Sequence, residues 1–99
     1  MVHVTCPLDQ AKAIAQTLVK RRLAACINIL GPMDSVYRWG DGVENDREAL
    51  LLLKTRRDRY SELEAAIRSL HRYELPEIVG VEIFCGSAAY LDWIKTSTE

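Results

Sequence analysis

The sequence predicts a single α+β domain over residues 1–99, in which two helices cover one face of a four-stranded antiparallel sheet. Three observations predict it. Short strand-like runs and two amphipathic helical stretches alternate in the order β-α-β-β-α-β. The step Gly40-Asp41-Gly42, flanked by runs of period two, is a strong hairpin signal. The run Leu50–Leu53 is apolar on both faces of its strand, so we expect both faces to be covered.

The first quarter of the chain supplies one strand and one helix. The run Val2–Thr5 is β-prone, and Pro7 disfavours helix for the residue before it. Asp9 is the expected N-cap of a helix from about Gln10 to Ala25, whose apolar residues repeat at helical spacing.

The next stretch forms the long hairpin. Its first strand begins at Cys26–Leu30, is interrupted by Gly31-Pro32, and resumes from about Ser35, since a proline in a sheet belongs at a bulge or an edge. Tyr37 and Trp39 share one face of this strand. The glycine before the Asp-Gly step predicts a three-residue loop.

The second half adds a helix, a strand and a terminal helix. Asp58 is one cap for the second helix, and Ser61 with Glu64 forms an alternative capping box. The fourth strand is expected over Ile78–Cys85, and Ser87 is the expected N-cap of the last helix. This order is the ferredoxin-like plan, in which the helices leave one sheet face bare. Other copies of the chain are the simplest cover for that face.

Composition narrows the function classes. With 48% hydrophobic and 27% charged residues the chain is an ordinary globular protein, and its net charge of -1 argues against nucleic acid or an anionic membrane as the main partner. No apolar run approaches about 20 residues and no secretory signal opens the chain, so we expect a cytoplasmic protein. The three cysteines are far apart, which indicates reduced thiols.

Six short strings stand in order along nearly the whole chain. They are Val4-Thr5-Cys6-Pro7, Arg22-Leu23-Ala24-Ala25-Cys26-Ile27-Asn28, Tyr37-x-Trp39, Leu52-Leu53-Lys54-Thr55, His71-x-Tyr73-Glu74-x-Pro76-Glu77-Ile78 and Tyr90-Leu91-x-Trp93-Ile94. Together their order and spacing resemble the CutA family of divalent-cation tolerance proteins. Two departures stand out: Arg72 replaces the proline that usually follows the histidine, and Leu70 occupies a position where some members carry a second histidine.

The resemblance implies a ferredoxin-like subunit of a tight homotrimer, similar in fold to the trimeric PII signalling proteins. The long hairpins would pack between neighbours and extend each other's sheets. It also implies a link to tolerance of copper and other divalent metal ions, with no enzymatic reaction and no obligatory cofactor.

Imidazole, thiolate and carboxylate together bind borderline metals such as copper and zinc. The candidate ligands are His71, Glu77 and Cys6. The alternative for His71 is a structural one, because a histidine at the end of a helix often caps it. Spacing alone does not define a site here, since His71 and Glu77 are not a helical i, i+4 pair.

A second candidate site is a pocket at a subunit boundary. Its expected polar groups are Lys54 and Glu77. Its expected aromatic lining is Tyr37, Trp39, Tyr73 and Trp93. The alternative is that these aromatics only supply packing area. The basic run Lys54–Arg57 before the second helix is expected to be solvated surface, with anion binding as the alternative.

An enzyme is not indicated. Cys6 and His71 would form a nucleophile–base pair only if the fold united them. Glu44, Asp46 and Glu48 alternate on one strand face and are interpreted as solubility charges. The sequence therefore predicts a non-catalytic trimer that binds or responds to divalent metals. The rival hypothesis is a PII-like sensor of nucleotides or small molecules, and a scaffold trimer is a third.

Overall fold

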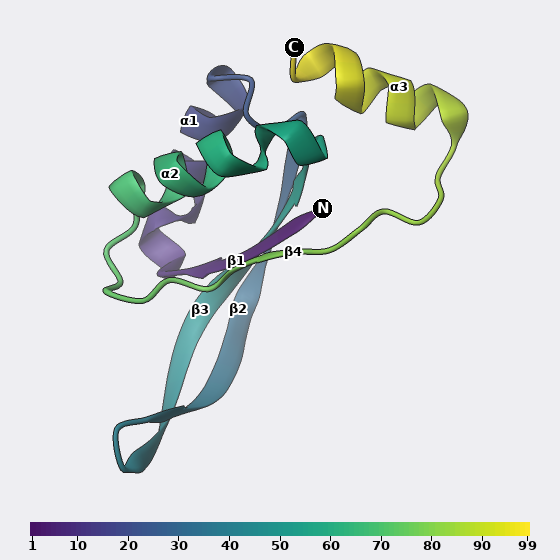
Figure 1. Cartoon of the computed structure of the whole chain (residues 1–99). Helices are drawn as coiled ribbons and strands as arrows, with labels where there is room; N and C mark the ends of the chain where they lie inside the picture. The colour runs from purple at the N-terminus through teal and green to yellow at the C-terminus, as the bar shows by residue number, and fades with distance from the viewer.

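The computed structural model describes residues 1–99 and confirms the ferredoxin-like order of elements (Figure 1). All neighbouring strands are antiparallel, in the spatial order β2-β3-β1-β4. The elements are β1 (Val2–Cys6), η1 (Leu8–Gln10), α1 (Ala11–Lys20), β2 (Cys26–Trp39), β3 (Gly42–Lys54), η2 (Arg57–Arg59), α2 (Tyr60–Leu70), β4 (Ile78–Gly80) and α3 (Ala88–Ser97).

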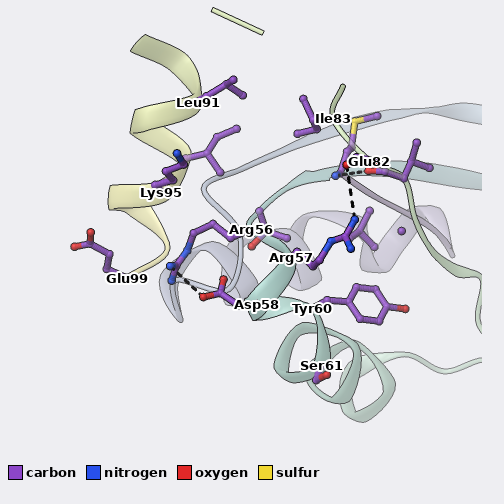
Figure 2. Close-up of a pocket in the computed structure, with 16 residues that line it drawn as sticks. Arg56, Arg57, Asp58, Tyr60, Ser61, Glu82, Ile83, Leu91, Lys95 and Glu99 are labelled. Atoms are coloured by element: carbon purple, nitrogen blue, oxygen red, sulfur yellow. Dashed lines mark hydrogen bonds and ion pairs between the residues drawn. The ribbon is translucent and has the colours of Figure 1, made fainter. Parts of the chain in front are cut away.

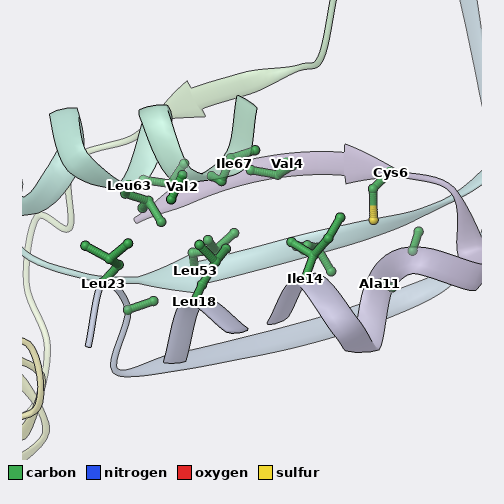
Figure 3. Packing of buried hydrophobic residues seen from close by; sticks show 14 residues of the cluster. Val2, Val4, Cys6, Ala11, Ile14, Leu18, Leu23, Leu53, Leu63 and Ile67 are labelled. Atoms are coloured by element: carbon green, nitrogen blue, oxygen red, sulfur yellow. The ribbon is translucent and has the colours of Figure 1, made fainter. Parts of the chain in front are cut away.

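The core lies between the sheet and the pair α1 and α2, which cover the same face (Figures 1 and 3). Because side chains alternate along a strand, every second residue of the two central strands points at the helices. These residues include Val4 of β1 and Leu51 and Leu53 of β3, all fully buried. They meet Leu18 of α1 and Leu63 of α2 in one hydrophobic cluster.

Helix α1 is shorter than predicted, at both ends. Its start is a 3₁₀ turn without a side-chain cap, so the prediction of Asp9 as N-cap is wrong. Its end is set by Arg22, which adopts φ 61°. The N–H groups of Arg22 and Leu23 bond the carbonyls of Val19 and Leu18 at 3.0 Å, the pattern of a Schellman motif that stops the helix.

The hairpin of β2 and β3 projects from the body and makes the molecule elongated, 45 × 26 × 22 Å (Figure 1). The register of the two strands shifts between Leu30 and Met33, as expected for a proline-containing bulge. The predicted three-residue loop is wrong: Trp39 already pairs with Gly42, which leaves a two-residue turn. Gly40 supplies its positive φ of 60°.

The end of the chain departs most from prediction. Strand β4 stops at Gly80, although the sequence predicted strand over Ile78–Cys85. Residues 82–86 have no backbone hydrogen bonds within the chain and run to α3 (Figure 1). Phe84 in this segment is 96% exposed. Ser87 caps α3 as predicted, its hydroxyl oxygen accepting the N–H of Tyr90 at 3.2 Å.

The face of the sheet opposite the helices stays partly bare. Leu50 and Leu52, which alternate with the buried leucines of β3, are only half-buried. Leu30 and Val79 on flanking strands are 45% and 49% exposed. The chain's own helices therefore cover one side of the four-leucine run and not the other. The longest helix, α2, has 11 residues, and no helix is long and apolar enough to cross a membrane.

Candidate functional site

His71 lies where α2 ends and the 71–77 loop begins, and the end of β1 lies against it. Its Nε2 is 2.6 Å from the carbonyl oxygen of Thr5, and its Nδ1 accepts the backbone N–H of Tyr73 at 3.1 Å. A carbonyl only accepts and an amide N–H only donates, so the imidazole is neutral with its proton on Nε2. Neither ring nitrogen has a free lone pair for a metal ion in this arrangement.

Cys6 is the next residue of β1 and is fully buried (Figure 3). Burial, and then the negative charges of Glu48 and Asp9, raise the pKa of the Cys6 thiol to about 11. Since the thiolate is the metal ligand, Cys6 must lose a tightly held proton before it can bind a metal.

Glu48 is the site residue that the sequence did not indicate. It was grouped with Glu44 and Asp46 as an exposed solubility charge, but only 6% of it is exposed. Its Oε2 accepts the hydroxyl of Tyr73 at 3.0 Å. Burial and this hydrogen bond raise the pKa of Tyr73. The correction follows from position: at Glu48 the hairpin enters the sheet, one residue before Ala49 pairs with Cys6.

The fold thus brings Cys6, His71 and Glu48 to one end of β1, together with Tyr73. Glu77 is exposed at the far end of the loop, and no hydrogen bond or ion pair joins it to either predicted ligand. No group of three or more histidine, cysteine and acidic side chains is arranged to hold a metal ion. The residues present therefore do not form a ready-made metal centre.

The predicted pocket residues are not gathered within one chain. Tyr37 and Trp39 contact edge to face near the hairpin tip, with ring centroids 6.5 Å apart. Lys54 lies at the opposite end of the same hairpin, where its ammonium donates a hydrogen bond to Oδ1 of Asn28. Trp93 lies on α3 beside Tyr90. A shared pocket needs a second copy to bring the hairpin tip to the other residues.

A different cavity does exist in the single chain, with a volume of about 1280 Å³ (Figure 2). It lies between the segment that leaves β4, helix α3 and the start of α2. None of the predicted pocket residues lines it. Its arginines face carboxylates, Arg56 with Asp58 at 3.3 Å and Arg57 with Glu82 at 3.9 Å. Positive charge that is matched in this way does not define an anion site.

The raised pKa of Cys6 makes a prediction about stability in alkali. The unfolded chain loses this proton near pH 9 and the folded chain near pH 11, so the thiol's contribution is complete below pH 9 and is lost as pH rises to 11. We expect wild-type protein to lose at most about 2–3 kcal/mol more than Cys6→Ala over that interval. Urea denaturation at pH 8 and pH 11 measures the difference. Parallel pH profiles of the two proteins would contradict it.

These observations define an α+β protein of ferredoxin-like plan, with a long hairpin and a histidine-bearing loop that contacts the end of its first strand. Residues 1–97 match the family model described as CutA1 divalent ion tolerance protein, and the chain belongs to that family. It is 42% identical to the divalent-cation tolerance protein CutA of Thermus thermophilus, over 99% of this chain and 96% of that protein. It is 38% identical to Protein CutA of Homo sapiens, over 97% of this chain.

Solved structures agree with these relatives. The CutA1 structure from Thermus thermophilus superposes with a TM-score of 0.96, covering 99% of this chain and 96% of that one. The periplasmic CutA of Archaeoglobus fulgidus, 33% identical, gives 0.95 over the same shares. The chain spans about half the length of the human protein and of the chloroplastic CutA of Arabidopsis thaliana. None of these names is that of an enzyme.

Proposed function

We propose that this chain is a non-catalytic, homotrimeric divalent-cation tolerance protein that binds copper and other divalent ions beneath the 71–77 loop. The observation that carries the proposal is the grouping of a thiol, a carboxylate and an imidazole at the end of β1, from Cys6, Glu48 and His71. These three ligand types suit copper and zinc. We further propose a cytoplasmic location, which cell fractionation tests.

Binding at this site is weak and linked to pH. His71 must give up one of its two hydrogen bonds, and Cys6 must release its proton. Two carboxylates compete for the remaining position. Glu77 is the ligand predicted from the sequence and is reached when the loop moves, whereas Glu48 already lies beside the thiol.

Calorimetric titration with Cu(II) and Zn(II) tests the assignment. We expect His71→Ala to lower the affinity at least about tenfold, since it removes the only nitrogen ligand of the site. His3→Ala is the matched control, because the chain has two histidines and His3 lies on the sheet. Glu48→Gln and Glu77→Gln identify the carboxylate. Equal affinity for wild type and His71→Ala would remove the assigned ligand.

The trimer is proposed from the uncovered sheet. A half-buried row of leucines on one face needs a partner surface. The outer edge of β2 is unpaired along 14 residues, and residues 82–86 offer unpaired backbone groups. Copies related by a closed rotation satisfy the edges and the face together.

A second candidate function is a sensor of small molecules or nucleotides at clefts between subunits. It is favoured by the exposed aromatic rings of Tyr37, Trp39, Tyr90 and Trp93. Tyr37 and Trp39 lie near the hairpin tip, so they would border Lys54 only across subunits. A thermal-shift screen of nucleotides and small acids separates the candidates, because a true ligand raises the melting temperature with its concentration. A flat response to all of them would leave metal binding as the function.

A further inference from the structure

An ion pair ties the loop that carries His71 to the turn after β1. Nη2 of Arg72 lies 2.6 Å from Oδ1 of Asp9, the closest ion pair in the chain. Asp9 belongs to the 3₁₀ turn that follows Cys6.

A second tether joins the same loop to strand β3. The next residue, Tyr73, donates its hydroxyl to Glu48 of β3. Its ring lies against the imidazole of His71 in a tilted arrangement, with centroids 4.6 Å apart and an angle of 53° between the planes. The loop is thus fixed to two elements, the turn before α1 and strand β3. Both acidic anchors lie close enough to Cys6 for their charges to act on its thiol.

We propose that the Arg72–Asp9 ion pair and the Tyr73–Glu48 hydrogen bond form a two-point latch. The latch holds the 71–77 loop closed over Cys6 and His71, so that thiol and imidazole become available only when the loop opens. The divalent cation as the species admitted rests on the proposed function; the mechanics of the latch do not.

The two tethers differ in strength. The ion pair is solvent-exposed, with 56% and 75% of its side chains accessible, and pairs of this kind contribute little. The hydrogen bond is part-buried and its acceptor is a carboxylate, so breaking it also leaves Glu48 without its partner. The Tyr73 hydrogen bond therefore stabilises the closed loop more than the Arg72 ion pair does.

The test measures exposure of the Cys6 thiol without any metal. In a Cys26→Ser, Cys85→Ser background Cys6 is the only thiol, and its rate of reaction with dithionitrobenzoate at low salt reports loop opening. We expect Arg72→Ala to raise the rate about threefold, because it breaks the ion pair without removing negative charge near the thiol. Asp9→Asn should raise the rate by more, because it also removes a charge that raises the pKa of the thiol. Tyr73→Phe should raise it about tenfold.

Arg57→Ala is the matched control, since it removes an exposed arginine with only a loose partner at 3.9 Å, and its rate should equal the background. Asp9→Asn is a surface change, so the test survives if Tyr73→Phe fails to fold. Unchanged labelling in Asp9→Asn and Arg72→Ala would overturn the latch. So would equal acceleration in Arg57→Ala.

Titration of the same variants with Zn(II) separates the latch from the proposed function. If the closed loop competes with the metal, opening it raises zinc affinity by the same factor as the labelling rate. Faster labelling with unchanged zinc affinity supports the latch and overturns metal binding by Cys6 and His71.

Discussion

Leu52→Glu should convert the proposed trimer into folded monomers. Leu52 lies in the middle of the bare sheet face, between His3 of β1 and Asn28 of β2. In one chain it is half-buried, so a glutamate there still reaches water and the fold survives. Between packed copies the same carboxylate would be desolvated without a partner. The free-energy cost of burying this unpaired charge in every copy should prevent the copies from associating.

Sedimentation equilibrium measures this outcome. We expect a mass of three chains for wild type and 11.2 kDa for Leu52→Glu, with unchanged circular dichroism. Ala65→Glu is the control, because it adds the same charge at an exposed position of α2. A Leu52→Glu protein that still sediments as three chains would show that this face is not the interface.

Local signals explain why most of the fold could be predicted. Period-two alternation, helical spacing and the Asp-Gly step each depend on neighbours in the sequence. The errors arise where distant partners decide. The segment from residue 82 to residue 85 has strand propensity but no strand beside it in one chain, and β structure requires a paired neighbour. Helix α1 stops early because Arg22 adopts a left-handed conformation, which is rare for a residue other than glycine and is not predicted from its type.

The site was predictable only in part. The sequence predicts both Cys6 and His71 as ligands, but it does not predict that they lie close together. That proximity depends on the topology, which places His71 against Thr5 at the end of β1, although the two are 66 residues apart in the sequence. Glu48 was missed because its alternation with Glu44 and Asp46 is that of an exposed strand face. The 71–77 loop brings the hydroxyl of Tyr73 to its carboxylate, and no local pattern in the sequence predicts that contact.

Adjacent leucines of β3 should respond differently to truncation, and this contrast is the strongest stability prediction. Leu51 is fully buried against the helices, so Leu51→Ala leaves a cavity inside the subunit. We expect it to lower the free energy of unfolding by about 3–4 kcal/mol, a large share of the 5–15 kcal/mol typical of a domain. The loss acts on each chain and is independent of protein concentration.

Leu52→Ala removes the same atoms one residue further along, on the opposite face. Within one chain the cost is small because Leu52 is only half-buried. In the proposed trimer each copy would lose contact area, so the loss would appear as an equilibrium between chains and grow on dilution. Urea denaturation at two protein concentrations a hundredfold apart distinguishes the two effects. The difference in midpoint between Leu51→Ala and wild type should be the same at both concentrations. If the difference between Leu52→Ala and wild type is also the same at both, the bare face is closed by something other than copies of this chain.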